Sequence, residues 1–259
     1  MRINSETEAL FARLDDLCRV ADKGGVAISS FLTPREIYAC SQYLTCVGKR
    51  FFCYGGYAES ERQRIYILPD YVEAGDVQGL EAYGFDAEIS AVKVTPSGYR
   101  SLTHRDYMGS VLGLGIERAV IGDIVVYEDG SVVIFCDKVM CPFIEENLVK
   151  VANDKVRTKE VPICDVSVPE RRFAPISDTI ASRRLDCIVG SLCALSREKA
   201  KLAVEGGLVE LNFECEERAD REVVPPCIVS VKGYGRFEVL SASEKTKKGR
   251  YRLSAKKYL

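Results

Sequence analysis

The chain has 259 residues, 47% of them hydrophobic, which is enough for two or three small domains with real cores. Its net charge of −2 excludes a general polycation, and no apolar run approaches the length needed to span a bilayer. The charge is uneven, since residues 171–259 carry 18 Lys and Arg against 12 Asp and Glu, and such a basic third is typical of a localised site for a polyanion.

The cysteines point to no metal site. There are eleven cysteines without a Cys-x-x-Cys pair, and His104 is the single histidine. Metal sites need clustered ligands at tight spacing, so we expect no metal and no other cofactor. Free cysteines in apolar runs pack as small hydrophobic residues. An odd count without a signal peptide favours a reducing compartment, and the expected localisation is cytoplasmic.

Residues 1–75 are predicted to form an N-terminal α/β domain. The segment Glu6–Val20 places its leucines at helical spacing. A second helix is expected to begin at Thr33–Glu36, where a capping Thr precedes Pro and an early Glu. Lys49–Tyr57 and Arg64–Leu68 have the composition of two strands joined through a glycine turn. Aromatic residues in the first strand could stack on bases, but such residues more often fill a core.

Residues 76–165 follow the order β-α-β-β-α-β, which is the ferredoxin-like arrangement also used by RNA-recognition domains. Asp129-Gly130 is a strong turn signal for the central hairpin. Its second strand, Ser131–Phe135, carries one aromatic residue, so an RNA contact here would depend on shape and charge. The strands are expected at Ala87–Val94, Ile124–Tyr127, Val132–Cys136 and Val156–Ile163, and the helices at Thr103–Leu112 and Pro142–Val151.

The C-terminal part begins after an expected extended linker, Val166–Ser177, in which prolines flank two arginines. Between Arg183 and Leu192 the apolar residues fall at helical spacing. Ser196 can cap a second short helix, and Gly206–Gly207 ends it. Several strand-like runs follow. The basic tail Ser241–Leu259 leaves two alternatives open, a disordered tail or a further strand.

The polar side of these two helices is basic. A helix N-terminus beside arginines suits a phosphate, because free backbone N–H groups and the helix dipole both favour an anion. Taken alone, the charges favour an ordinary solvated face. Their arrangement carries more information: Arg184-Leu-Asp186, Ser196-Arg197, Lys201, Glu205-Gly-Gly207, Val209-x-x-Asn212 and Val231-x-Gly-x-Gly-x-Phe237 occur in this order.

This order resembles the small RNA-binding domain named after the fourth protein of the small ribosomal subunit, the S-four domain. The resemblance places RNA on the two-helix corner and on the adjoining sheet. Together with the cations it implies an RNA-binding set that consists of Arg183, Arg184, Ser196, Arg197, Lys199, Lys201, Lys232, Tyr234, Arg236, Lys247, Lys248 and Arg250.

A second resemblance rests on residues 105–124, which read RDYMGSVLGLGIERAVIGDI. This stretch is similar to the YlmH family of bacterial RNA-binding proteins, which carry an S-four domain at the C-terminus and are linked by gene neighbourhood to cell division. The similarity extends to residues 232–237 and 245–250. It implies a role in ribosome-associated quality control, in which the protein holds a large subunit that bears peptidyl-tRNA.

The expected class is α+β with three domains: an α/β domain at 1–75, a ferredoxin-like domain at 76–165, and an S-four domain with its basic tail at 178–259. The expected function is a non-catalytic factor that binds rRNA or tRNA on the large ribosomal subunit, with quality-control proteins as further partners and with no membrane or small-molecule substrate. One alternative is a pseudouridine synthase or rRNA methyltransferase anchored by the S-four domain, but no catalytic motif supports it. Another is a cell-division adaptor.

Overall fold

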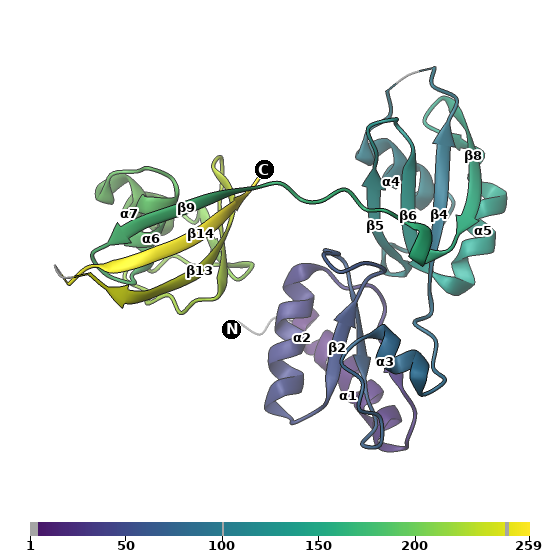
Figure 1. Ribbon diagram of the computed structural model, residues 1–259, viewed down its shortest axis with the longest axis horizontal. Coiled ribbons are helices and arrows are strands. Elements are labelled where there is room, and N and C mark those ends of the chain that lie inside the picture. The colour runs from purple at the N-terminus through teal and green to yellow at the C-terminus, as the bar shows by residue number, and fades with distance from the viewer. Residues whose placement is uncertain (1–4, 100, 247–248) are drawn as a thin grey trace. The chain divides into compact units, whose positions relative to one another are not determined.

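The computed structural model describes residues 5–99, 101–246 and 249–259 (Figure 1). The chain divides between Pro169 and Glu170 into two compact units. Each unit combines helices with antiparallel sheet, so the α+β class is confirmed. No helix within the described ranges combines the length and the apolar character needed to cross a membrane.

The first part of the N-terminal unit is a three-stranded sheet covered by helices. The order of its strands is β1-β3-β2. The predicted capping of the second helix is confirmed, because the Thr33 hydroxyl accepts a hydrogen bond from Glu36 N–H at 3.4 Å and the Glu36 carboxylate accepts one from Thr33 N–H at 2.7 Å. The elements are α1 (Ser5–Asp22), β1 (Ala27–Ile28), α2 (Pro34–Cys46), β2 (Phe51–Tyr54), β3 (Arg64–Ile67) and α3 (Val77–Ala82).

The second part of this unit has a five-stranded sheet in the order β5-β6-β4-β8-β7, with α4 and α5 packed on one face. Apolar residues of β4, β6, α4 and α5 form one core there. Its elements are β4 (Ile89–Pro96), α4 (His104–Leu112), η1 (Arg118–Val120), β5 (Ile121–Val126), β6 (Val132–Asp137), η2 (Lys138–Met140), α5 (Cys141–Asn147), β7 (Lys150–Val151), β8 (Asp154–Val161) and η3 (Ile163–Asp165).

The elements of this sheet follow the predicted order, with one correction. The helix expected to run to Val151 ends at Asn147, and Lys150–Val151 form the strand β7 instead. β7 and β8 pair across a tight turn in which Ala152 has a φ of 50°. The pairing positions Val151 in the core, where it is fully buried. Tertiary burial of one apolar residue therefore decides the conformation of this short segment.

The two parts of the N-terminal unit share an interface. The Asp123 carboxylate at the start of β5 accepts hydrogen bonds from the Tyr57 hydroxyl and Glu61 N–H, each at 2.7 Å, and from Arg62 N–H at 3.0 Å. Phe135 of β6 is fully buried against Tyr57. These contacts join residues that are far apart in the sequence into one unit.

The C-terminal unit is a six-stranded antiparallel sheet in the order β11-β10-β12-β13-β14-β9, with two helices packed against it. The two predicted short helices are confirmed, and the Ser196 hydroxyl accepts a hydrogen bond from Lys199 N–H at 3.4 Å. The elements are β9 (Phe173–Ile180), α6 (Leu185–Leu192), α7 (Arg197–Glu205), β10 (Val209–Leu211), β11 (Glu214–Cys215), β12 (Cys227–Val231), β13 (Gly235–Lys245) and β14 (Tyr251–Tyr258).

The sequence predicts an extended linker up to Ser177, but the structure places its last residues in a strand. Residues from Phe173 onward form β9, which pairs with β14 from Phe173↔Tyr258 to Ile180↔Tyr251. Of the two alternatives for the tail, the strand is the one observed. Leu253 and Ala255 of β14 are buried, so the alternate residues of this basic strand complete the core.

Candidate nucleic-acid interface

The corner formed by α6 and α7 is organised around a buried carboxylate. Asp186, which is 1% exposed, accepts hydrogen bonds from Arg184 Nε at 3.1 Å, from Arg184 Nη2 at 2.8 Å, and from Cys187 N–H at 2.8 Å. Arg197 Nε lies 4.0 Å from the same carboxylate. The bidentate pairing fixes the plane of the Arg184 guanidinium, whereas the Arg197 side chain is 73% exposed and projects from the start of α7.

The protonation of Asp186 reflects two opposed effects. Burial acts to raise the pKa of this carboxyl group, because it penalises the charged form. The hydrogen bonds and the positive charge of Arg184 outweigh burial, so the pKa of Asp186 is lowered from its ordinary value of 3.8. Asp186 therefore remains charged and holds Arg184 in place at neutral pH.

This lowered pKa predicts a pH dependence of stability. A carboxyl group whose pKa is lower in the folded state contributes stability that is present above its ordinary pKa of 3.8 and is lost as the pH falls through the folded-state value. We expect the α6–α7 corner to lose protection against hydrogen exchange below about pH 4. The Asp186→Asn variant should lose protection already at pH 7 and should show a flatter pH profile. A profile as steep as that of the unmodified protein would contradict this role of Asp186.

Two other expected phosphate-binding cations are also paired. Arg183 Nη2 lies 2.6 Å from Glu222, and its guanidinium lies 5.5 Å from the ring centroid of Tyr251. Lys201 Nζ lies 3.6 Å from Glu205, one helical turn further along α7. The four cations expected to contact phosphate thus each have a carboxylate within 4.0 Å: Arg183, Arg184, Arg197 and Lys201. The net positive charge of the α6–α7 corner is therefore smaller than these cations alone would give. Lys199 is exposed and forms no ion pair with any described residue.

A groove of about 200 Å³ opens between the end of β9 and α6. Arg197 and Arg250 both line it, and Arg250 Nη2 donates a hydrogen bond to the Thr179 carbonyl at 2.5 Å. The groove also contains Asp178, which accepts a hydrogen bond from the Ser191 hydroxyl at 2.5 Å. This hydrogen bond is the main reason why the pKa of Asp178 is lowered. Both carboxylates of the groove are therefore already engaged by neighbours.

Three further residues of the expected set lie elsewhere on the C-terminal unit. Lys232 and Tyr234 lie in the turn before β13, and Tyr234 is 42% exposed. Arg236 lies at the start of β13, with its guanidinium 5.7 Å from the ring centroid of Phe213. Arg250 follows the other end of β13, and a strand of eleven residues spans roughly 30 Å. Lys232, Tyr234 and Arg236 therefore form one group, and it is separated by the length of β13 from the group that contains Arg250. Lys247 and Lys248 lie outside the described residues.

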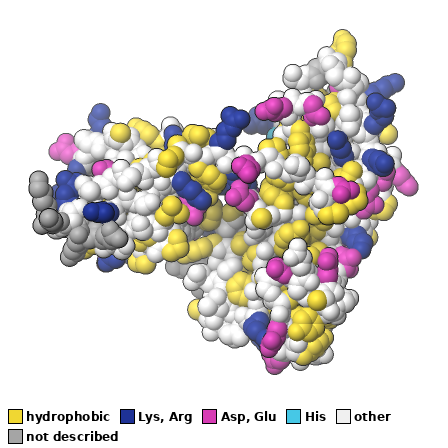
Figure 2. All heavy atoms as spheres, viewed as in Figure 1, with side chains coloured by type: hydrophobic (Ala, Val, Ile, Leu, Met, Phe, Trp, Pro, Cys, Tyr) yellow, Lys and Arg dark blue, Asp and Glu magenta, His cyan; other side chains and the backbone are white. Residues whose placement is uncertain are grey.

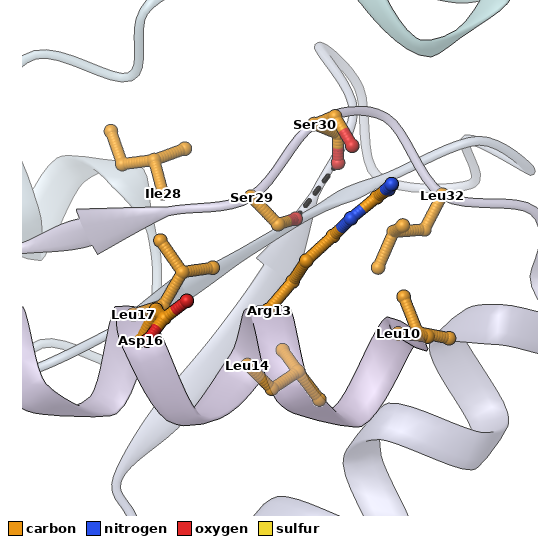
Figure 3. Close-up of a pocket in the computed structure, with 9 residues that line it drawn as sticks. All are labelled: Leu10, Arg13, Leu14, Asp16, Leu17, Ile28, Ser29, Ser30 and Leu32. Atoms are coloured by element: carbon orange, nitrogen blue, oxygen red, sulfur yellow. Dashed lines mark hydrogen bonds between the residues drawn. The ribbon is translucent and has the colours of Figure 1, made fainter. Parts of the chain in front are cut away.

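A separate pocket of about 250 Å³ lies beside α1 in the N-terminal unit (Figure 3). Leucine side chains form much of its wall, and Arg13 extends from α1 toward the segment that contains Ser29 and Ser30. The Ser29 hydroxyl donates a hydrogen bond to the Ser30 carbonyl at 2.8 Å. The lining contains no histidine or cysteine. Across the described ranges, no group of three or more His, Cys, Asp or Glu residues is arranged to hold a metal ion.

Comparison with known proteins identifies relatives of both parts of the N-terminal unit. Residues 5–72 match the family model described as "YlmH, N-terminal", and residues 82–165 match the model described as "Putative RNA-binding domain in YlmH". The chain is 27% identical over 238 residues to "Ribosome-associated protein quality control protein P2" of Bacillus subtilis (strain 168). That alignment covers 91% of this chain and 88% of the relative.

The fold is also similar to a solved structure, "Cell division protein ylmH from Streptococcus pneumoniae", with a TM-score of 0.50 and 23% identity. This similarity covers 64% of the present chain and 96% of the streptococcal one, and at such identity it concerns the fold alone. The two matched family models together cover more than half of the chain, and the Bacillus relative extends the alignment over most of the rest. The chain therefore belongs to the YlmH family.

Proposed function

We propose that this protein is a non-catalytic RNA-binding factor that acts in the cytoplasm on the large ribosomal subunit, in the quality control of stalled peptidyl-tRNA. The name of the Bacillus relative and the RNA-binding description of the family model both support this proposal. The observation that carries it is the groove that is lined by both Arg197 and Arg250, which come from distant parts of the sequence.

The charges around this groove favour an anion. Asp186 is engaged by Arg184, and Asp178 by the Ser191 hydroxyl, so neither carboxylate needs Arg197 or Arg250 as its main partner. The N-terminus of α7 adds backbone N–H groups and the positive end of the helix dipole. A phosphate of rRNA or tRNA fits these donors. Because the excess of positive charge is small, tight binding to RNA requires additional contacts outside the groove.

The fold is consistent with known RNA-binding architectures. In the C-terminal unit the α6–α7 pair packs on an antiparallel sheet, which supports our assignment of residues 178–259 to an S-four domain. In the N-terminal unit the strand order β5-β6-β4-β8, with two helices on one face, supports a ferredoxin-like domain within 76–165. The α/β domain at 1–75 completes the proposed three-domain organisation.

The groove is tested with the double variant Arg197→Gln/Arg250→Gln. Both side chains reach the groove, and neither is the main partner of a buried carboxylate, so we expect the fold to persist. Co-sedimentation with purified large ribosomal subunits should weaken about tenfold or more near physiological salt, and the slope of log affinity against log salt should decrease by about two.

A matched control removes the same charge elsewhere. Lys23 and Arg35 are exposed on the N-terminal unit, and neither forms an ion pair with a described residue. The variant Lys23→Gln/Arg35→Gln should bind like the unmodified protein. If the groove variant and this control co-sediment equally well, the groove is not the RNA site. If the unmodified protein does not co-sediment at all, the ribosomal function itself is wrong.

The absence of catalysis is part of the proposal and has its own test. An RNA-modifying enzyme with the same RNA-binding surface would leave a chemical mark on its substrate. Mass spectrometry of rRNA from a strain that lacks the gene should therefore show the complete set of modifications. A single missing modification that the restored gene returns would establish the enzymatic alternative.

A further inference from the structure

Four cations lie on two neighbouring strands of the five-stranded sheet of the N-terminal unit, on the face opposite α4 and α5. Val92, Val94 and Val156 pack into the core beneath these helices. Successive side chains of a strand point to opposite faces, so the residues that alternate with these valines along β4 and β8 point to the other face. They include Lys93 of β4 and three cations of β8, all exposed: Lys155, Arg157 and Lys159. We call these four residues the sheet strip.

The pairing within the strip is unfavourable for the protein alone. Lys93 and Lys159 are directly opposite each other in the β4–β8 register. Like charges at opposed positions of neighbouring strands destabilise a sheet. No residue of the strip forms an ion pair with any described residue, although Lys93 is close enough to Asp129 to contribute to the lowering of the pKa of that carboxyl group. The fold therefore keeps a repulsive pair in which neither lysine forms an ion pair within the described part of the chain.

Protection of a sheet edge explains only part of the strip. Lysines on an exposed edge strand discourage pairing with another chain, and beyond the short pairing of Asp154 and Lys155 with β7 no described strand pairs with the outer edge of β8. Lys93 does not fit this explanation, because β4 lies between β6 and β8 with both edges paired. A cation at this interior position, opposite another cation, indicates a negatively charged partner.

We propose that the sheet strip binds the phosphate backbone of RNA, as a second contact besides the groove of the C-terminal unit. The inference rests on the proposed ribosomal function and assigns the additional contacts that the groove requires. The three cations of β8 recur every second residue, about 6.7 Å apart, and Thr95, opposite Arg157, adds an exposed hydroxyl. A row of regularly spaced donors suits a polymer with regularly repeated charges. Figure 2 shows Lys and Arg side chains gathered around β8.

The first test uses the full-length variant Lys93→Gln/Lys159→Gln with purified large ribosomal subunits as the probe. Each lost phosphate contact should lower the salt slope by about one, and the affinity near physiological salt should fall roughly tenfold. The variant Lys23→Gln/Arg35→Gln again serves as the control for net charge. Binding of the Lys93→Gln/Lys159→Gln variant at the level of this control would overturn the proposal.

A second variant separates binding from stability. Lys159→Glu places a carboxylate opposite Lys93 and converts the repulsive pair into an attractive one. We expect the thermal unfolding temperature to rise while the affinity for large subunits falls more than tenfold. A protein that becomes more stable and yet binds worse has lost a functional contact. A rise in stability with unchanged binding would show that the strip serves another purpose, such as docking an acidic protein.

The outcomes also distinguish this inference from the proposed function. If the groove variant Arg197→Gln/Arg250→Gln loses binding and the strip variants do not, the ribosomal function stands and the strip is not part of it. Loss in both, with a greater loss when they are combined, supports two separate contacts to RNA. Crosslinking of the bound protein by ultraviolet light should then attach RNA to peptides that contain residues 89–96 or 154–161.

Discussion

Arg184→Ala is expected to unfold the α6–α7 corner, although the side chain lies at the surface. Its guanidinium is the bidentate partner of Asp186, which is 1% exposed. A buried charge that loses its main partner is destabilising, since the charge then lies in a medium that solvates it poorly. Hydrogen exchange followed by mass spectrometry should show lost protection in peptides from residues 185–205 and no change in peptides from residues 5–99.

The control for this prediction is Arg197→Ala. Arg197 approaches the same carboxylate only to 4.0 Å and is 73% exposed, so its removal should change protection little. Replacement of both charges, as in Arg184→Met/Asp186→Leu, should recover much of the protection, because an apolar pair leaves no buried charge. Equal protection in Arg184→Ala and the unmodified protein would refute the structural role of this arginine.

The pairing of Arg184 with Asp186 complicates binding experiments that use Arg184 variants. Loss of RNA binding in an Arg184 variant would not identify a phosphate contact, because the variant also disturbs the start of α6 and its neighbour α7. Arg197 and Arg250 are the informative positions, since they line the groove without holding a buried carboxylate as its main partner. The structure therefore changes which arginines a mutational test should use.

Gly56→Ala is expected to destabilise the N-terminal unit strongly. A Cβ atom at this position would lie 2.2 Å from the Phe135 ring. The backbone has a φ of +106°, a conformation that residues other than glycine rarely adopt. Overpacking costs about 1–3 kcal/mol and the strained backbone a similar amount. The sum, roughly 2–6 kcal/mol, should lower the thermal unfolding temperature of the unit by many degrees.

Gly48→Ala is the matched comparison. Gly48 also has a positive φ, +71°, but a Cβ atom there would meet nothing within 4 Å. Only the conformational cost of about 1–2 kcal/mol remains. The difference between the two variants isolates the close approach of Gly56 to Phe135, and therefore the packing between the two parts of the N-terminal unit. Similar unfolding temperatures for the two variants would show that this contact is easily relaxed.

Local structure follows closely from the sequence. Thr33 and Thr103 each form a capping box with the acidic residue three positions later, and Ser196 caps α7. These signals are readable because the interacting groups are neighbours in the chain. The Asp129-Gly130 turn joins β5 and β6 for the same reason. Composition also located the basic third of the chain, residues 171–259.

Most side-chain contacts at the candidate sites could not be predicted from the sequence. Ion pairs such as Arg183–Glu222 join residues that are distant in the chain, and no local pattern indicates them. The alternating cations Lys155, Arg157 and Lys159 are visible in the sequence, but their meaning depends on the residue that faces them. Lys93 became relevant only when the β4–β8 register placed it opposite Lys159.

By itself the sequence determined the helices α1, α2, α4, α6 and α7, the hairpin turn, the α+β class and the family, because each depends on short-range spacing or on an ordered set of residues; it missed α3 and the end of α5. Tertiary structure alone decided that residues 173–177 join the sheet, that the basic tail forms a strand between β9 and β13, and that Asp186 engages Arg184. The physical reason is pairing: a strand acquires its conformation from the neighbour that satisfies its backbone groups, and a charge acquires its role from the partner that burial brings near.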